Sequence, residues 1–304
     1  MGTPVFAIPS LEGMAKSENV IAVFTQPDRP KGRGQKKTSP PIKETAEKLK
    51  IPCYQPESLK SETVINDIRR LTPELIVVVA YSLFLPKKVL EIPKHKTINL
   101  HPSLLPKYRG AAPMQWALIN GDRETGITIS YITEAMDAGD ILNQETMVVN
   151  DSDSLMTLEH KLSLLGADLL CKTISSLKED KISVRAQNEK EATFAPKLRK
   201  EMGQIDWKKS ARSIFNLIRG ANPWPGTFAA LEGEPLKIHQ AKIISEEKGG
   251  TPGKIQSVSN EGIAVETVRG VLLLTEVQKP NRKRMPVAEF LKGCQITPGS
   301  QFDV

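Results

Sequence analysis

Residues 75–100 read LIVVVAYSLFLPKKVLEIPKHKTINL, and this stretch decides the fold class. It opens with LIVVVA, a continuous apolar run of strand length, and closes with the shorter run TINL at 97–100. Strands without polar alternation are typical of a parallel sheet that is covered on both faces. We therefore expect two buried strands here, joined through a crossover.

The same kinds of segment extend outward from this stretch. Further strand-like runs are VIAVFT at 20–25 and GITISYI at 126–132. Helical patterns lie between and after these strands, at 42–50, 61–71, 114–119 and 153–178. Alternation of strands and helices predicts βαβ units. The first two thirds of the chain should form a Rossmann-like α/β domain with a mostly parallel sheet.

The pattern changes after about residue 185. Residues 186–204 are polar, and 209–218 predict one more helix. Short alternating strands then begin near residues 236, 254, 263 and 271, which is typical of a small barrel or sandwich. We predict a catalytic domain at 1–189, a linker at 190–206 and a C-terminal domain at 207–304.

Composition excludes several classes of protein. No apolar run approaches the ~20 residues of a membrane span, and no signal segment opens the chain. Three cysteines without a C-x-x-C pair argue against a disulfide scaffold or zinc ribbon and fit the cytoplasm. Net charge is +7, and residues 190–304 hold 18 basic against 12 acidic residues. This excess indicates either a polyanionic partner or only a basic surface.

Polar side chains leave the strand at 97–100 on one face. Asn99 and His101 are two residues apart, so both point the same way, at the end where open parallel sheets bind ligands. An amide and an imidazole can both donate hydrogen bonds to an oxyanion formed in acyl transfer. The alternative is that they only shape the strand end. Tyr81 follows the strongest strand, and we expect it to line the same cleft.

A carboxylate should join them from the stretch AMDAGD at 135–140. This stretch follows the strand at 126–132, so we expect it at the same edge of the sheet. A carboxylate there can orient a histidine or position a water. Asp137 and Asp140 are the candidates, and an ordinary turn before Gly139 is the alternative.

Residues 26–43 form a third candidate segment, QPDRPKGRGQKKTSPPIK. Its prolines and glycines predict a long structureless loop, which is usually functional or disordered. Its cations suit contacts with phosphate, and a solvated basic loop is the alternative reading.

Together these segments resemble the methionyl-tRNA formyltransferase family over essentially the whole chain. The motifs that carry the resemblance are GTPVFAIPSL at 2–11, TQPDRPKGRGQK at 25–36, NLHPSLLPKYRGAAPMQW at 99–116, MDAGD at 136–140 and NPWPGTFA at 222–229. The part N-x-H…SLLP…D of this set, at Asn99, His101, 103–106 and Asp137, is less specific and is similar to the wider folate-dependent formyltransferases. The basic loop and the C-terminal domain distinguish the tRNA enzymes from them. One departure is that only Met1 precedes Gly2, where the family has a first strand.

The resemblance implies a Rossmann-like catalytic domain and an OB-fold-like β-barrel. It implies transfer of the formyl group of 10-formyltetrahydrofolate to methionine on initiator methionyl-tRNA, with no metal, by a cytoplasmic protein that we expect to be a monomer. It favours Asp137 over Asp140 as the acid of the D-x-G turn. The residues implied are Asn99, His101 and Asp137 for catalysis; Ser103, Leu104, Leu105 and Pro106, with Tyr81 beside them, for folate; and Arg33, Lys36 and Lys37 for tRNA.

Two other functions compete with this one. A formyltransferase acting on a small amine, such as a nucleotide sugar, could keep the same catalytic residues but has no use for the cations of residues 26–43. A non-catalytic RNA-binding protein could keep the basic C-terminal domain but has no use for the catalytic set. Folate binding and tRNA binding, measured separately, distinguish the three.

Overall fold

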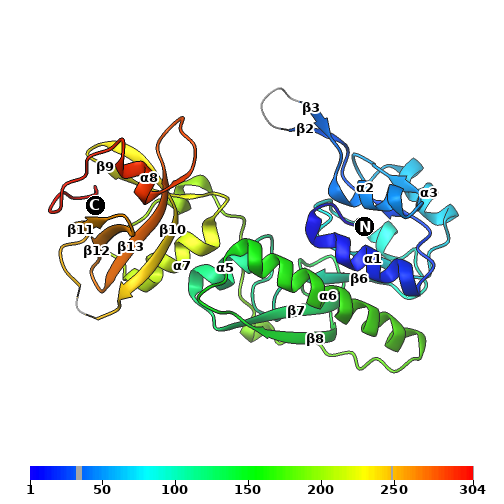
Figure 1. The fold of residues 1–304 in the computed structure, drawn as a ribbon. Coiled ribbons are helices and arrows are strands. Elements are labelled where there is room, and N and C mark those ends of the chain that lie inside the picture. Colours follow the sequence, from blue (N-terminus) through cyan, green and yellow to red (C-terminus); the bar gives the residue numbers. More distant parts are fainter. Residues whose placement is uncertain (32–35, 248, 304) are drawn as a thin grey trace. The chain divides into compact units, whose positions relative to one another are not determined.

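The computed structural model describes residues 1–31, 36–247 and 249–303 (Figure 1). The chain divides into two compact units. The first contains residues 1–113, 124–148 and 159–195, and the second contains residues 114–123, 149–158 and 196–304. Each unit is described by itself below.

The main sheet of the first unit has four strands in the order β5 (Ile76–Val78), β6 (Thr97–His101), β7 (Glu124–Tyr131) and β8 (Ile141–Val148). The strands predicted at 75–80 and 97–100 are confirmed as β5 and β6, and they pair in parallel. The predicted mostly parallel sheet is confirmed in part: the sheet is mixed, because β7 runs antiparallel to both β6 and β8. Six consecutive residues of β7 are buried. A continuous apolar run indicates that a strand is buried on both faces, but it does not indicate the direction of that strand.

Helices cover this unit on both sides of the sheet. They are α1 (Ile8–Ser17), α2 (Pro41–Lys48), α3 (Glu62–Arg70), α4 (Lys87–Leu90) and most of α6 (Leu155–Lys178), with the 3₁₀ turns η1 (Val5–Ala7) and η2 (Glu189–Glu191). In Figure 1, α6 runs along β7 and β8. Gly166 lets α6 approach closely, because a Cβ there would lie 2.9 Å from Leu100 and 3.4 Å from Ile127. A larger residue at this position would push α6 away from the strands that carry the candidate site.

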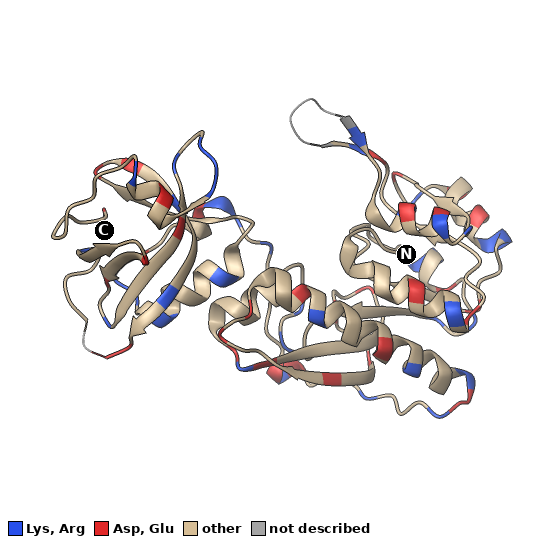
Figure 2. Ribbon diagram, viewed as in Figure 1, with Lys and Arg blue, Asp and Glu red and all other residues tan. Residues whose placement is uncertain are grey.

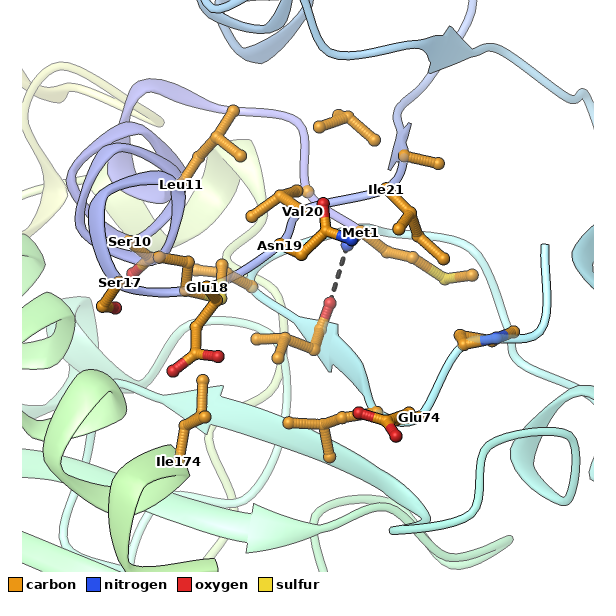
Figure 3. Close-up of a pocket in the computed structure, with 18 of the residues that line it drawn as sticks. Met1, Ser10, Leu11, Ser17, Glu18, Asn19, Val20, Ile21, Glu74 and Ile174 are labelled. Atoms are coloured by element: carbon orange, nitrogen blue, oxygen red, sulfur yellow. Dashed lines mark hydrogen bonds between the residues drawn. The ribbon is translucent and has the colours of Figure 1, made fainter. Parts of the chain in front are cut away.

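A second, two-stranded sheet pairs β1 (Val23–Phe24) with β4 (Cys53–Tyr54) in parallel. Met1 and Gly2 lie between this sheet and β5. Gly2 N donates to Phe24 O at 3.0 Å, and the Met1 amine donates to Val77 O at 2.6 Å. A cavity of about 740 Å³ opens beside Met1, and Figure 3 shows residues from α1, from the 19–23 stretch and from 71–75 around it. Met1 and Gly2 thus bridge the two sheets by backbone hydrogen bonds, at the place where a first strand was expected to be absent.

Residues 26–43 contain a β-hairpin, so the prediction of a structureless loop is wrong. Strand β2 (Arg29–Lys31) pairs antiparallel with β3 (Lys36–Thr38). Lys31 and Lys36 are paired in this ladder. Glycine-rich composition predicted flexibility, but an antiparallel pair needs only backbone hydrogen bonds along its strands and tolerates lysine and proline at a sheet edge.

The second unit is built on one antiparallel sheet with the order β11–β12–β13–β10–β9, and β14 pairs with β13. Its strands are β9 (Thr227–Leu231), β10 (Glu234–Ser245), β11 (Ile255–Ser259), β12 (Gly262–Glu266), β13 (Val271–Gln278) and β14 (Met285–Pro286). The four strands predicted from the sequence are confirmed. Strand β9 was missed, because its turn to β10 is only two residues long and merges the two runs.

Helices complete this unit: η3 (Lys200–Gly203), α5 (Pro113–Asn120), α7 (Ala211–Ala221) and α8 (Val287–Leu291). Its core includes Trp207, which is fully buried and lies with its ring centroid 5.0 Å from that of Phe302. The C-terminal residues are thereby held against the same core. In the described part of the chain, no helix is long and apolar enough to cross a membrane.

Candidate active site

Strand β6 presents Asn99 and His101 on one face, as predicted from their spacing. His101 is buried, with 4% of its surface exposed, and Asn99 is half-buried. Because β6 lies between β5 and β7, both residues have a fixed backbone. The strand therefore supplies two oriented polar side chains at its carboxyl half.

The structure brings Asp137 to these two residues. Asn99 Nδ2 donates to Asp137 Oδ1 at 3.3 Å, and His101 Nδ1 lies 3.7 Å from Asp137 Oδ2. Gly110 N donates to the same Oδ2 at 2.9 Å. Asp140 stays exposed, away from this cluster. Of the two acidic candidates, only Asp137 reaches the amide and the imidazole.

The sequence predicted that Asp137 lies near Asn99 and His101 because its segment follows a strand of a parallel sheet. That reason is wrong. Strand β7 is antiparallel to β6, so its carboxyl end lies beside Ile98, where Ile98 pairs with Tyr131. The loop at 132–140 instead folds back toward the other end of β6. Asp137 sits in this loop with a φ of 50°, an uncommon conformation for a residue other than glycine. The Asp137 carboxylate is thus positioned by the path of this loop, and strand order alone does not predict that path.

The ring orientation of His101 is set by a backbone carbonyl. His101 Nε2 lies 2.9 Å from Tyr108 O. A carbonyl oxygen only accepts hydrogen bonds, so Nε2 carries the proton in this contact. Nδ1 therefore faces Asp137, at a distance longer than a hydrogen bond. In neutral His101, Nδ1 is the nitrogen with the free lone pair.

The turn at 103–106 is rigid because its backbone is fastened to β7 and β8. Thr128 Oγ1 donates to Ser103 O at 2.6 Å and accepts from Leu105 N at 3.0 Å. Gln144 Nε2 donates to Leu105 O at 2.8 Å. Ser103 and Leu105 are buried, whereas Leu104 and Pro106 are half-buried. Sequence analysis missed Thr128 and Gln144, although polar residues inside buried strands are a usable signal.

Tyr81 lies in the apolar core of the first unit. Only 1% of its surface is exposed, and it packs in the cluster that includes Phe24 and Ile65. Burial raises the pKa of its hydroxyl, which has no hydrogen-bond partner within the described residues. This placement favours a packing role for the side chain, and its predicted contact with folate stays untested.

The base of the β2–β3 hairpin is anchored by an ion pair. Lys43 Nζ lies 2.9 Å from Asp28 Oδ2, and Gln55 Nε2 donates to Asp28 Oδ1 at 2.7 Å. The hydrogen bonds from Gln55 and Lys43 lower the pKa of Asp28. Lys37 is exposed, only the backbone of Lys36 is described, and Arg33 lies outside the described residues.

Comparison with known proteins places these features in context. A family model described as "Formyl transferase" matches residues 7–174, and one described as "Formyl transferase, C-terminal domain" matches residues 197–295. A methionyl-tRNA formyltransferase of Alkaliphilus oremlandii is 45% identical over 99% of this chain and 97% of its own length. One of Geobacter metallireducens is 45% identical over 98% and 96%.

Solved structures share the fold at low identity. WlaRD, a sugar 3N-formyl transferase crystallised in the presence of dTDP and 5-N-formyl-THF, aligns with a TM-score of 0.67 at 18% identity, covering 93% of this chain and 97% of that one. HypX of Aquifex aeolicus in complex with tetrahydrofolic acid aligns with a TM-score of 0.61 at 20% identity, covering 84% of this chain and 45% of that one.

Proposed function

The chain belongs to the methionyl-tRNA formyltransferase family, and we propose that it transfers the formyl group of 10-formyltetrahydrofolate to the α-amino group of initiator methionyl-tRNA. The geometric observation that carries this proposal is the convergence of Asn99, His101 and Asp137 at distances of 3.3 and 3.7 Å. An amide donor, an imidazole and a carboxylate around one point are what formyl transfer to an amine requires.

Asn99 and His101 stabilise the oxyanion in the proposed mechanism. The amine of methionine attacks the formyl carbon, a tetrahedral intermediate forms, and the bond from that carbon to the folate nitrogen then breaks. Asn99 has a second amide hydrogen besides the one donated to Asp137. Nε2 of His101 is committed to the Tyr108 carbonyl, so His101 donates to the oxyanion from Nδ1 in its protonated form.

Asp137 serves as the charge partner and proton acceptor. Its carboxylate oxygen Oδ2 lies 3.7 Å from Nδ1 of His101. The attacking amine must lose a proton, which Asp137 accepts directly or through a water. The folate nitrogen takes up a proton as it leaves. Protons therefore balance between the two substrates without a metal ion.

The turn at 103–106 is our proposed folate contact. Ser103 and Leu105 hold the turn from inside, and Leu104 and Pro106 present its outer surface. The turn follows His101 directly, so a folate bound against it brings its formyl group close to the catalytic residues. Tyr81 enters this proposal only as a residue predicted to lie beside the folate-binding turn.

Transfer RNA is the proposed partner of the basic segments. Within residues 26–43 these are Arg33, Lys36 and Lys37. Figure 2 shows a second basic segment in the C-terminal unit, the loop between β13 and β14, where Lys279, Arg282 and Lys283 are exposed. We propose that the C-terminal domain is OB-fold-like and tRNA-binding, with the division at 1–189, 190–206 and 207–304. The monomeric state and cytoplasmic location stay predictions.

The test of this function is transfer of a labelled formyl group from 10-formyltetrahydrofolate. Initiator methionyl-tRNA is the substrate, and elongator methionyl-tRNA is the control. Labelling of the initiator alone establishes donor, acceptor and reaction together. Absence of transfer to either tRNA by the folded protein, with transfer to a nucleotide-sugar amine, would replace the proposal by the small-amine alternative.

A further inference from the structure

One segment beyond the catalytic residues crosses the site, and the sequence suggested only a linker for most of it. Arg185 pairs with Ile141 at the start of β8, with backbone hydrogen bonds of 2.8 and 2.9 Å in both directions. Ala195 N donates to Arg109 O at 2.8 Å, and Arg109 N donates to Thr193 O at 2.9 Å. Residues 185–195 are thus fastened at both ends, on either side of the Asp137 loop.

Gln187 lies between these anchors and holds the Asp137 loop by its backbone. Its Nε2 donates to Asp137 O at 2.8 Å and to Gly139 O at 2.7 Å. Both amide hydrogens are therefore used on a single loop. The loop is tight, since a Cβ on Gly139 would lie 1.8 Å from Tyr131 O. A residue at φ 50°, as Asp137 is, persists where its surroundings hold it in place.

Arg109 decides which way the Gln187 amide faces. Its Nε and Nη2 donate to Gln187 Oε1 at 3.0 and 2.8 Å. Arginine only donates, so the amide oxygen must face Arg109 and the amide nitrogen must face the loop carbonyls. Arg109 is 4% exposed, and its Nη1 and Nη2 also donate to Glu189 at 2.8 and 2.7 Å. This ion pair raises the pKa of Arg109 and keeps it charged.

The same backbone stretch also contacts the catalytic side chains. Tyr108 O accepts from His101, and Gly110 N donates to the Asp137 carboxylate. Arg109 lies between these two residues. Three consecutive residues therefore couple His101, Gln187 and Asp137 into one hydrogen-bonded network.

We propose that Gln187, oriented by Arg109, is a positioning residue that fixes the Asp137 carboxylate against Asn99 and His101. This inference rests on the proposed function. It assigns Gln187 no contact with substrate, and its effect on the reaction passes through Asp137.

The first experiment compares Gln187→Glu with the wild type in the formyl-transfer assay. Glutamate has the same shape but places a carboxylate oxygen against two carbonyl oxygens. The Asp137 carboxylate should then lose its alignment with Asn99 and His101, and kcat should fall by roughly 10- to 100-fold. The KM for 10-formyltetrahydrofolate and for initiator methionyl-tRNA should change less than about twofold. Asn66→Asp, the same chemical change on the exposed face of α3, should leave both constants unchanged.

A double-mutant cycle separates positioning from a general structural role. In the Asp137→Asn background, Gln187→Glu should lower kcat by less than about threefold further, because the carboxylate that Gln187 positions is already absent. Thermal unfolding of each variant checks that the fold is kept. Multiplicative losses in the double variant, or full activity of Gln187→Glu, would overturn the inference. An inactive wild type would instead reject the proposed function.

Discussion

The carboxyl end of β6 and the edge of the sheet beside β5 satisfy their polar groups in different ways. At β6, the Asp137 carboxylate has Asn99 and Gly110 as donors, and its loop is held by Gln187. Beside β5, the Met1 amine is buried with Val77 O as its hydrogen-bond acceptor, next to a cavity of about 740 Å³. In the first region, hydrogen bonds between segments hold the side chains that the proposed reaction requires to be aligned. The second is where the sheet is least complete.

The comparison predicts its largest effect at β6. Asn99→Ala and His101→Ala should each lower kcat by roughly 10²–10³-fold, as loss of one oxyanion donor does. The measurement is initial rates of formyl transfer at saturating substrates. His160→Ala, an exposed histidine on α6, is the control and should retain full activity. Wild-type kcat in either variant would remove that residue from the mechanism.

The next largest effect is expected in the free energy of unfolding, and it comes from the buried Met1 amine beside β5. Burial lowers the pKa of the Met1 amine from 8.0 to about 5, so the unfolded chain binds this proton more tightly. For a chain that begins at Met1, the free-energy cost of burying this amine is full below pH 5 and disappears above pH 8. The free energy of unfolding should therefore rise by about 3 kcal/mol from pH 5 to pH 8.

Urea unfolding at four pH values between these limits measures that slope. Glu18, Glu74 and His95 line the same cavity, so the amine must be isolated from them. Acetylation converts the amine into an uncharged amide N–H, and it should flatten the slope. An unchanged slope after acetylation would assign the pH dependence to other groups.

A smaller effect should come from filling the cavity. Six apolar, β-branched residues fused ahead of Met1 would extend Met1 and Gly2 into a strand between β1 and β5. Buried apolar surface should then raise the Tm by roughly 5 °C. A glycine–serine extension of equal length also replaces the amine by a peptide N–H but fills nothing. Equal Tm values for the two extensions would show that the cavity does not accept a strand.

The smallest effect on chemistry is expected at the hairpin, whose anchored base contrasts with its exposed Lys37. Replacing Arg33, Lys36 and Lys37 by glutamine should raise the KM for tRNA and lower the salt slope of binding by up to about 3. The kcat should stay within about twofold of the wild type. Lys87→Gln on α4 is the control. A salt slope that does not move would exclude phosphate contacts by the hairpin.

Several features follow from local sequence, because they depend on neighbours along the chain. The spacing of Asn99 and His101 puts both side chains on one face of β6 in any sheet. Continuous apolar runs predicted β5 and β6, and short alternating runs predicted four strands of the second unit. The motif at 136–140 singled out Asp137 through resemblance to its family. These predictions needed no knowledge of which strands pair.

Other features depend on contacts between distant residues. The antiparallel direction of β7, the hairpin at 29–38 and the return of the Asp137 loop were not predicted, because burial patterns carry no strand direction. Gln187 lies in the polar stretch at 186–204, just before the predicted linker at 190–206, and nothing in that stretch marks which polar residue has a buried partner.

The sequence by itself thus determined which groups we propose for the chemistry: an amide, an imidazole and a carboxylate on predictable elements. The tertiary structure decided how they are held. His101 takes its orientation from Tyr108, and Asp137 takes its position from Gly110 and Gln187. Chemical identity belongs to single side chains, whereas orientation comes from hydrogen bonds between segments that only folding brings together.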